Sequence, residues 1–493
     1  MSEQSKAVMR AMTSGYMFDS KAFDLINRLP PELDQTELVK RILERKRGAG
    51  NDRLITEEDV RSLLPKGILE PIGTILPETH EPAGEPEVIF DPTQAISPTD
   101  ASEGYKGLFR DRYQRLLAIV RSRPDMRGVT GTGEARNLKQ GQRAKVAGLL
   151  SSRINRRGSM ELVLDDPAGT LRVVCQDDVV VKAALELPLD CLVVVDVLRS
   201  KAGQAYANSI TMPDIADRRP TVASHESFVV LLSDLHVGSK MFLVEDFQRF
   251  ILWLNGRLGD ETLVNKIRYI VVAGDLVDGV GVYPGQELQL GDKEPKHQYH
   301  ASAQLLEQIP KHIQVIVSPG NHDAVRQALP QPAVSVDLAE SLYGLENVRW
   351  VGNPAYVRLD GVMFLVYHGR SLDDVIATTP NLSYRRPTDA MRLLLRSRHL
   401  APTYGKRTAL APELRDMLVV DPVPEVFHCG HVHTIDVSSY RGTLLINSGT
   451  WQAQTNFQAN MGLEPTPSIV PIVNLSTLEV VRRNFGAEGF VNS

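Results

Sequence analysis

The sequence predicts a multidomain α+β protein made of an N-terminal helical domain, a small β-barrel and a layered α/β domain. Three observations lead to this fold class. First, 493 residues with 42% hydrophobic content can fill more than one core. Second, a proline-rich, acidic stretch interrupts the chain at residues 66–103. Third, the spacing of apolar residues changes from helical to alternating near residue 127, and becomes near-continuous after residue 225.

Residues 1–65 are expected to form the N-terminal helical domain, which we interpret as a bundle for protein contacts. Thr56 followed by Asp59 is typical of a capping box at a helix start. Residues 67–103 then contain six prolines and neither Lys nor Arg, which predicts a flexible acidic linker over residues 66–103. A basic, amphipathic connecting helix is expected at residues 104–126.

Residues 127–217 show the alternation of a half-buried sheet. The five expected strands are residues 145–154, 159–166, 170–176, 191–200 and 205–212, with a short helix at 178–187 between the third and the fourth. This order is the layout of an OB-fold barrel, although other small barrels would also fit.

Basic residues gather at the first predicted hairpin of this barrel: Arg143, Lys145, Arg153, Arg156 and Arg157. A solvated charged face is the favoured reading, and contact with a single-stranded nucleic-acid backbone is the alternative. The net charge of −5 excludes a global basic field, so any DNA contact must be local or shared with a partner.

Polar side chains follow five of the apolar runs expected to form strands in residues 225–493. Such runs imply strands buried on both faces of a layered domain, and functional groups gather beyond the carboxyl ends of such strands. Because side chains in a strand alternate, residues two apart should point the same way, so two such pairs could converge on one metal site. The candidates at these strand ends are Asp234, His236, Asp275, Asn321, His322, His368, His431 and His433.

The types of these side chains indicate a metal centre. Imidazoles, carboxylates and one amide suit Mn²⁺, Fe²⁺ or Zn²⁺, and the lack of cysteine argues against a structural zinc site. Seven ligands suit two cations that share a carboxylate, and two cations about 3.5–4 Å apart promote displacement at phosphorus. His322 is the additional group and could protonate a departing alkoxide, with Asp323 orienting its ring. Independent structural roles for all of these residues are improbable.

At this point the motifs resemble those of the calcineurin-like metallophosphoesterases. The series D-x-H, G-D-x-x-(D), G-N-H-(D/E), H and G-H-x-H occurs in order from Ser233 to His433. The resemblance implies an α/β metallophosphoesterase sandwich over residues 225–493 and His322 as the acid/base group. It assigns one metal to Asp234, His236, Asp275 and His433, and a second to Asp275, Asn321, His368 and His431, with Asp275 bridging.

Longer strings, among them "GDLVDGVGVYPGQE", "PGNHDAVRQALPQPA" and "INSGTWQAQTNFQANMG", resemble the small subunit family of archaeal family D DNA polymerases over residues 104–475. This resemblance implies a 3′–5′ exonuclease for single-stranded or mispaired DNA ends, with two divalent cations, Mn²⁺ or Mg²⁺. It also implies a complex with a large catalytic subunit. A sliding clamp could be reached through that complex, although the sequence has no convincing clamp-binding motif.

Two other functions stay open at this point. A metallophosphatase or cyclic-nucleotide phosphodiesterase could act alone, or the chain could be a scaffold with a vestigial site. Three cysteines without a CxxC pair, no signal peptide and no long apolar segment suggest a soluble, cytoplasmic protein. His297 and His300 are expected in a solvated loop, and the basic stretch 383–399 is either a positive strip or a salt-bridged helix.

Overall fold

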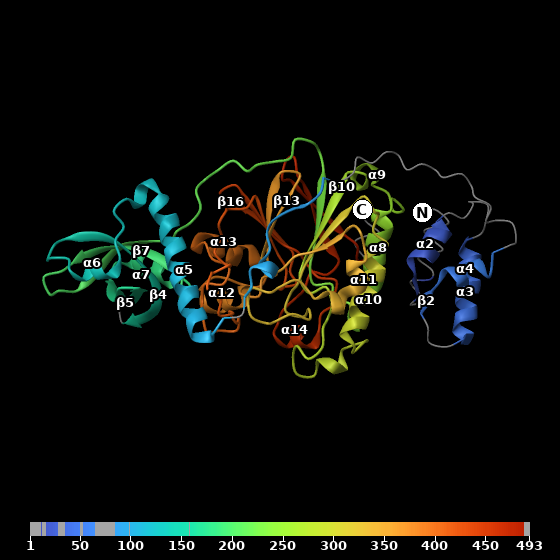
Figure 1. Cartoon of the computed structure of the whole chain (residues 1–493), viewed down its shortest axis with the longest axis horizontal. Helices are drawn as coiled ribbons and strands as arrows, with labels where there is room; N and C mark the ends of the chain where they lie inside the picture. The colour runs from blue at the N-terminus through green and yellow to red at the C-terminus, as the bar shows by residue number, and fades with distance from the viewer. Residues whose placement is uncertain are drawn as a thin grey trace.

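The computed structural model describes residues 11, 16–27, 35–49, 53–64, 84–97, 99–156 and 158–487. Figure 1 shows the barrel at one end of an elongated molecule, the large sheets in the middle and the N-terminal helices at the other end. Within these ranges, no helix has the length and the apolar character needed to cross a membrane.

The N-terminal unit contains three helices and a two-stranded parallel sheet. The elements are β1 (Met17–Phe18), α2 (Ser20–Asn27), α3 (Gln35–Ala49), β2 (Leu54–Ile55) and α4 (Glu57–Arg61). The capping box predicted at Thr56 and Asp59 is confirmed, because each side chain bonds the backbone N–H of the other residue. Buried Phe18, Phe23 and Ile42 form part of the core of this unit.

The predicted linker is wrong over its second half. Residues Glu87–Phe90 form β3, which pairs antiparallel with β13 (Ala355–Leu359) at the edge of a large sheet. The 3₁₀ helix η1 (Pro92–Gln94) follows it. An edge strand bonds along one side only, so prolines and acidic residues beside it are tolerated. Residues 65–83 of the predicted linker lie outside the described residues.

The barrel has the predicted strands and closes in the order β4-β5-β6-β8-β7. They are β4 (Arg143–Arg156), β5 (Ser159–Asp166), β6 (Gly169–Cys175), β7 (Leu192–Arg199) and β8 (Ala205–Thr211). Helix α7 (Asp178–Leu185) lies between the third and fourth strands, as predicted, and α6 (Thr132–Arg136) precedes the first. Apolar residues that alternate along the strands, such as Leu162 and Leu164, fill the interior.

The remaining chain builds two six-stranded sheets. The first has the order β12-β11-β10-β9-β18-β19: β12 (Val348–Trp350), β11 (Gln314–Ser318), β10 (Ile267–Ala273), β9 (Phe228–Leu232), β18 (Ile469–Asn474) and β19 (Val480–Asn484). The second has the order β16-β17-β15-β14-β13-β3, with β16 (Asp436–Tyr440), β17 (Thr443–Asn447), β15 (Val426–Cys429) and β14 (Val362–Val366). Buried residues of both sheets, including Val271 and Phe364, form one core between them.

Helices cover the outer faces of the two sheets (Figure 1). On the first sheet they are α8 (Val244–Leu254), α9 (Glu261–Val264), α10 (Pro295–Leu306) and α11 (Val336–Tyr343). On the second they are α12 (Leu372–Thr378) and α13 (Pro387–Ser397), while α14 (Asn456–Asn460) and η3 (Gln286–Leu288) lie in connecting loops. Strands β9, β10 and β11 run parallel, as do β14 and β15, so their carboxyl ends open on the same side.

Helix α5 (Ala101–Ser122), followed by η2 (Pro124–Met126), joins the barrel to the second sheet (Figure 1). It is the predicted connecting helix, and Asp100 caps its start. Its buried Leu116 packs in one cluster with Val194 of the barrel. On its other side, Arg112 donates to Asp416 at 2.7 Å and Tyr105 donates to the carbonyl of Leu410 at 2.9 Å.

Candidate metal centre and cleft

The predicted ligands come from tight turns just beyond the strands rather than from the strands themselves. Five of them have a left-handed backbone: Asp234 (φ 53°), His236 (φ 55°), Asp275 (φ 53°), His431 (φ 70°) and His433 (φ 59°). The prediction that strand alternation aligns each pair is therefore wrong, although both pairs do reach the same site. Such strained turns are concentrated at functional sites.

Close approach explains two of the adjacent glycines. A Cβ atom at Gly320 would lie 2.2 Å from Asp275 Oδ1, and one at Gly430 would lie 2.5 Å from Asp234 Oδ2. Both contacts are shorter than real Cβ atoms allow. Only glycine lets the backbone pass this close to the carboxylates.

The first ligand group brings together Asp234, His236 and His433. The Nε2 atoms of the two histidines are 3.1 Å apart, and His433 Nε2 lies 3.3 Å from Asp234 Oδ1. His236 Nε2 is also 3.9 Å from Asp275 Oδ2. Three side chains of this group, with Asp275 beside them, could hold one cation.

The second group contains Asp275, Asn321 and His368. His368 Nε2 lies 3.3 Å from Asp275 Oδ2 and 3.1 Å from Asn321 Oδ1. Asp275 thus adjoins both groups, as a bridging ligand would. His431 is less engaged: its ring centroid is 5.1 Å from that of His368, but its Nε2 lies 3.2 Å from Asp373 Oδ2.

The donor set fits divalent cations. Asp234 Oδ1 is buried without a hydrogen-bond partner, so it has a free lone pair. His236 Nδ1 donates to Asp278 Oδ1 (3.0 Å) and His368 Nδ1 donates to the carbonyl of Ala273 (2.9 Å), which leaves both Nε2 lone pairs for a metal.

The electrostatics of the site point the same way. Burial alone would lower the pKa of His368, but the Asp275 carboxylate outweighs it and raises that pKa to about 9. The pKa of Asp275 is held well below its usual range despite burial, because His368 lies beside it. A field that draws protons onto a buried imidazole would equally attract a metal cation.

His322 lies beside the first group, at the wall of a cleft of about 500 Å³. Its Nδ1 donates to the carbonyl of Asp278 at 2.8 Å, and its backbone N–H donates to Asp275 Oδ1 at 2.8 Å. Burial lowers the pKa of His322 to about 4, against the opposing effect of Asp275. A ring nitrogen of His322 also lies within reach of His236 and Asp275, so these three could hold a cation too.

The prediction that Asp323 orients His322 is wrong. Its carboxylate accepts from the N–H groups of Gly320 (2.8 Å) and Leu276 (3.3 Å) and from the hydroxyl of Tyr299 (3.2 Å). Asp323 therefore braces the turn that carries Asn321. At a turn, neighbouring side chains diverge, and the carbonyl of Asp278 fixes the His322 ring instead.

Sequence reasoning assigned no role to several residues of the cleft. Asp278 contacts His236 and belongs to the G-D-x-x-(D) motif, so the motif could have identified it. Asp373, next to His431, had no comparable signal. The other unassigned side chains of the lining include Tyr283, Arg370, Tyr384, Arg407, Gln452 and Gln458.

Comparison with known proteins shows the family. The chain is 40% identical over 489 residues to the DNA polymerase II small subunit of Archaeoglobus fulgidus, and the match covers 97% of each chain. The chain belongs to the archaeal DNA polymerase II small subunit family, also known as family D. It is 39% identical over 386 residues to the family member from Pyrococcus furiosus, covering 77% of this chain and 63% of that longer one.

Two further matches are coarser. The family model that describes the B subunits of DNA polymerases alpha and epsilon matches residues 229–435 of this family member. A solved archaeal phosphodiesterase covers 52% of the chain and 98% of its own, at 14% identity and a TM-score of 0.27. That likeness carries no argument here.

The basic residues proposed for DNA contact do not form one cluster. Arg143 and Lys145 lie at the start of β4, beside β7, whereas Arg153 and Arg156 lie toward its other end, beside β5. Arg153 Nη1 donates to the carbonyls of α7 and the residues after it, including that of Leu187 at 2.9 Å. Lys145 donates to the carbonyl of Asp125, and Arg156 lies 3.4 Å from Glu161. Arg157 lies outside the described residues.

Two other expectations also meet the structure. The basic stretch 383–399 forms α13 with salt bridges, since Arg386 and Arg392 both pair with Asp389. His297 and His300 are exposed as expected, but they lie in α10, so the loop prediction is wrong.

Proposed function

We propose that the cleft is a two-metal phosphodiesterase that removes nucleotides from single-stranded or mispaired 3′ ends of DNA. The observation that carries this proposal is the convergence of two ligand groups on Asp275, with His322 beside them. The sequence resemblance described above supports the 3′–5′ direction.

The first group would comprise Asp234, His236, Asp275 and His433, and the second Asp275, Asn321, His368 and His431. Two divalent cations, Mn²⁺ before Mg²⁺ because imidazole suits Mn²⁺ better, would supply an activated water and neutralise charge on the phosphate. His431 would turn from Asp373 toward the second group.

The protein's own groups would govern the leaving group. Water attacks phosphorus, the bond from phosphorus to the 3′ oxygen breaks, and a nucleoside 5′-monophosphate is released. Because Nδ1 of His322 is held by the carbonyl of Asp278, its Nε2 is free to give a proton to the departing 3′ oxygen. Asp323 acts only by bracing the Asn321 turn.

The size of the cleft favours an unpaired end. A site of about 500 Å³ is in the range of pockets that hold single small ligands, roughly 300–1,000 Å³. One nucleotide fits that space, whereas a stacked base pair requires more. A mispaired terminal nucleotide is easier to unstack, so a proofreading role follows from the same geometry.

The chain would work beside a large polymerase subunit, as the names of its relatives imply. Its net charge of −5 supports this, because DNA affinity derives mainly from phosphate neutralisation. We assign the barrel to the OB fold and give Arg143, exposed at the start of β4, the best claim among the basic residues to contact DNA. Contact with a sliding clamp would run through the assembled complex.

The test uses the full chain, alone and with the large subunit, with Mn²⁺ and DNA labelled near its 3′ end. A nitrophenyl phosphate ester is assayed in parallel. Release of 5′-mononucleotides supports the proposal. Ester cleavage without nucleolysis would indicate a phosphatase or a lone phosphodiesterase instead. Inactivity in both assays, with and without the partner, would indicate a scaffold.

A further inference from the structure

One wall of the cleft carries positive charge that the metal ligands do not use. Arg370 and Arg407 line the cleft near Tyr384, on the side where Asp373 contacts His431. In the part of the chain that the structure describes, neither guanidinium forms an ion pair with a carboxylate. The nearby exposed Arg385, by contrast, pairs with Glu464 at 3.3 Å. Unpaired arginines facing a site are free to bind an anion there.

Arg370 is tied to the metal-ligand turns. It follows His368 by two residues, and its Nη1 donates to Gln327 Oε1 at 3.1 Å. Gln327 Nε2 in turn donates to the carbonyl of Asn321 at 2.8 Å. The guanidinium is therefore held at a fixed place relative to the second ligand group.

Arg407 is held by helix α12. The N–H groups of Arg407 and Thr408 donate to the two carboxylate oxygens of Asp374, at 3.0 Å and 2.9 Å. The residue before Asp374, Asp373, contacts His431. One turn of α12 thus anchors both a metal-ligand histidine and the loop that presents Arg407.

The other end of this loop is anchored at the junction of α5 with the barrel. The ring of Tyr404 packs edge-to-face on Tyr105 (5.4 Å) and Phe109 (5.3 Å) of α5. Its N–H donates to Asp190 Oδ2 at 2.9 Å, just before the barrel strand β7. Only two residues, Gly405 and Lys406, separate Tyr404 from Arg407.

We propose that Arg370 and Arg407 bind phosphate oxygens of the DNA substrate, and that Tyr404 is a positioning residue that holds Arg407 over the cleft. This inference rests on the proposed function and deepens it. The cleft contains the carboxylates Asp275, Asp278 and Asp373, which repel a polyanion. The planar, two-pronged guanidinium matches a phosphate and offsets that repulsion. The phosphate bound is either the one being cleaved or its neighbour along the strand.

The first experiment compares the wild-type full chain with Arg407→Gln and Arg370→Gln. The substrates are the p-nitrophenyl ester of thymidine 5′-monophosphate, which has one phosphate, and a fluorescent oligothymidylate. Loss of one charged contact should raise KM for the oligothymidylate about tenfold. Lys406→Gln removes the same charge one residue away, outside the cleft lining, and should leave KM unchanged.

The two sources of phosphate are distinguished by substrate. A raised KM for both substrates assigns the arginines to the cleaved phosphate, and a raised KM for the oligothymidylate alone assigns them to a neighbour. An unchanged KM for both overturns the inference. Anisotropy of the labelled oligothymidylate without added metal gives Kd independently of turnover. If wild type binds but does not cleave, the proposed function fails and the Kd of the variants still decides the role of the arginines.

A double-mutant cycle tests Tyr404. Tyr404→Ala should raise KM severalfold by releasing Arg407, while Tyr404→Phe, which keeps the ring contacts, should behave as wild type. In the Arg407→Gln background, Tyr404→Ala should add no further change. Additive effects would show that Tyr404 acts on folding alone and would overturn its positioning role. Thermal midpoints of all variants are measured alongside.

Discussion

Two buried clusters in this chain are made from the same groups, yet their charges are balanced differently. At the α5 junction, Asp416 Oδ2 accepts from Arg112 Nε (2.7 Å) and His399 Nε2 (2.9 Å), and all three side chains are fully buried. In the cleft, the Asp234 and Asp275 carboxylates meet only imidazoles and backbone N–H groups. The first cluster includes its own permanent cation, and the second does not.

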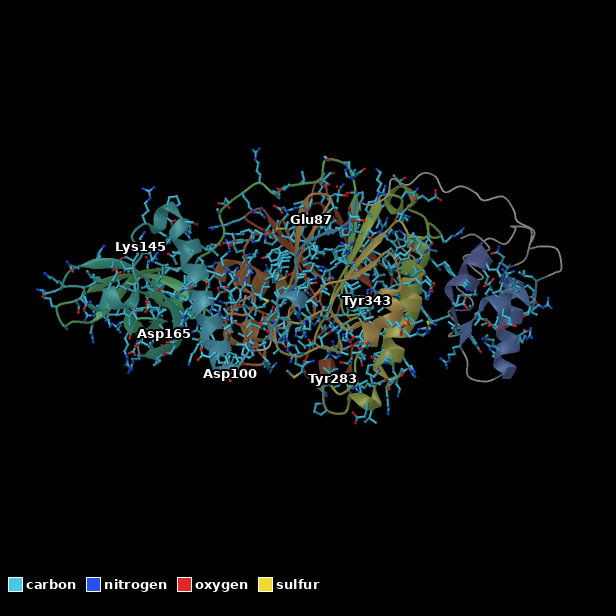
Figure 2. The ribbon with its side chains drawn as sticks, in the orientation of Figure 1. Glu87, Asp100, Lys145, Asp165, Tyr283 and Tyr343 are labelled. Carbon is cyan, nitrogen blue, oxygen red and sulfur yellow. The ribbon has the colours of Figure 1, made fainter. Side chains whose placement is uncertain are left out.

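The consequences are visible in the titration of the histidines. Burial, together with Arg112, lowers the pKa of His399 to about 4, so this ring stays neutral beside the ion pair. In the cleft, Asp275 raises the pKa of His368 to about 9. Figure 2 shows how densely side chains fill the layers between and around the sheets, so both sets of charges are shielded from bulk water. The comparison teaches that an unbalanced buried carboxylate marks a place for an external cation.

The largest expected effect follows from removing the carboxylate shared by both ligand groups. Asp275→Asn should lower nuclease activity about 10⁴-fold and remove both metals, because the bridging charge is lost. Metal-free stability should stay equal or rise, since a buried charge disappears. Metal content measured on the purified variant, with oligonucleotide degradation, checks this. Full metal occupancy would contradict the bridging role and weaken the contrast between the two clusters.

The next effect separates a proton donor from a ligand. His322→Ala should lower nuclease activity about 10³-fold, within the usual range for a general acid, while metal content stays unchanged. The lost activity should be smaller for a nitrophenyl ester, whose leaving group needs no proton. Because His322 lies within reach of His236 and Asp275, loss of metal from this variant would make it a ligand and refute its role as acid.

The sequence was sufficient to locate the site because its ligands follow apolar strands. The strand runs ending before Asp234, Asp275 and His368 were readable, and parallel strands bring their carboxyl ends together. The contacts within the site were less accessible. Asp323 follows His322 directly, yet it faces Gly320 and Tyr299, because adjacency along a turn does not set side-chain direction.

Long-range pairing was beyond sequence reasoning altogether. Strand β3 was predicted as linker because its partner β13 lies more than 260 residues away, and no local pattern connects them. The junction pair Arg112–Asp416 spans 304 residues for the same reason. The α5 helix itself was predictable from its amphipathic spacing, but its buried arginine only becomes intelligible once Asp416 is placed beside it.

The junction cluster should respond to mutation through stability rather than activity. Arg112→Met leaves the Asp416 carboxylate buried without its cation, which should cost about 3 kcal/mol or more of the free energy of unfolding. Arg115→Met, one turn along α5, is the matched control. Its partly exposed guanidinium bonds only the carbonyl of Asp416 and lies 3.7 Å from Asp111, so about 1 kcal/mol or less is expected.

Denaturant unfolding of both variants checks this, together with their metal content. Equal stability of Arg112→Met and Arg115→Met would show that the buried ion pair does not hold the junction. Reduced metal content at full folding would show that the two clusters are not independent.

The smallest expected effect is a proton-linked change at the same junction. His399 has a folded-state pKa of about 4, against roughly 6.5 when unfolded. Between these values the unfolded chain binds more protons, so the contribution of His399 is complete above pH 6.5 and is lost as the pH falls toward 4. The loss should reach about 2–3 kcal/mol. His399→Gln should reduce the slope of unfolding free energy against pH by about one proton in this window. An unchanged slope would mean that His399 titrates alike in both states, and that Arg112 and Asp416 do not keep it neutral.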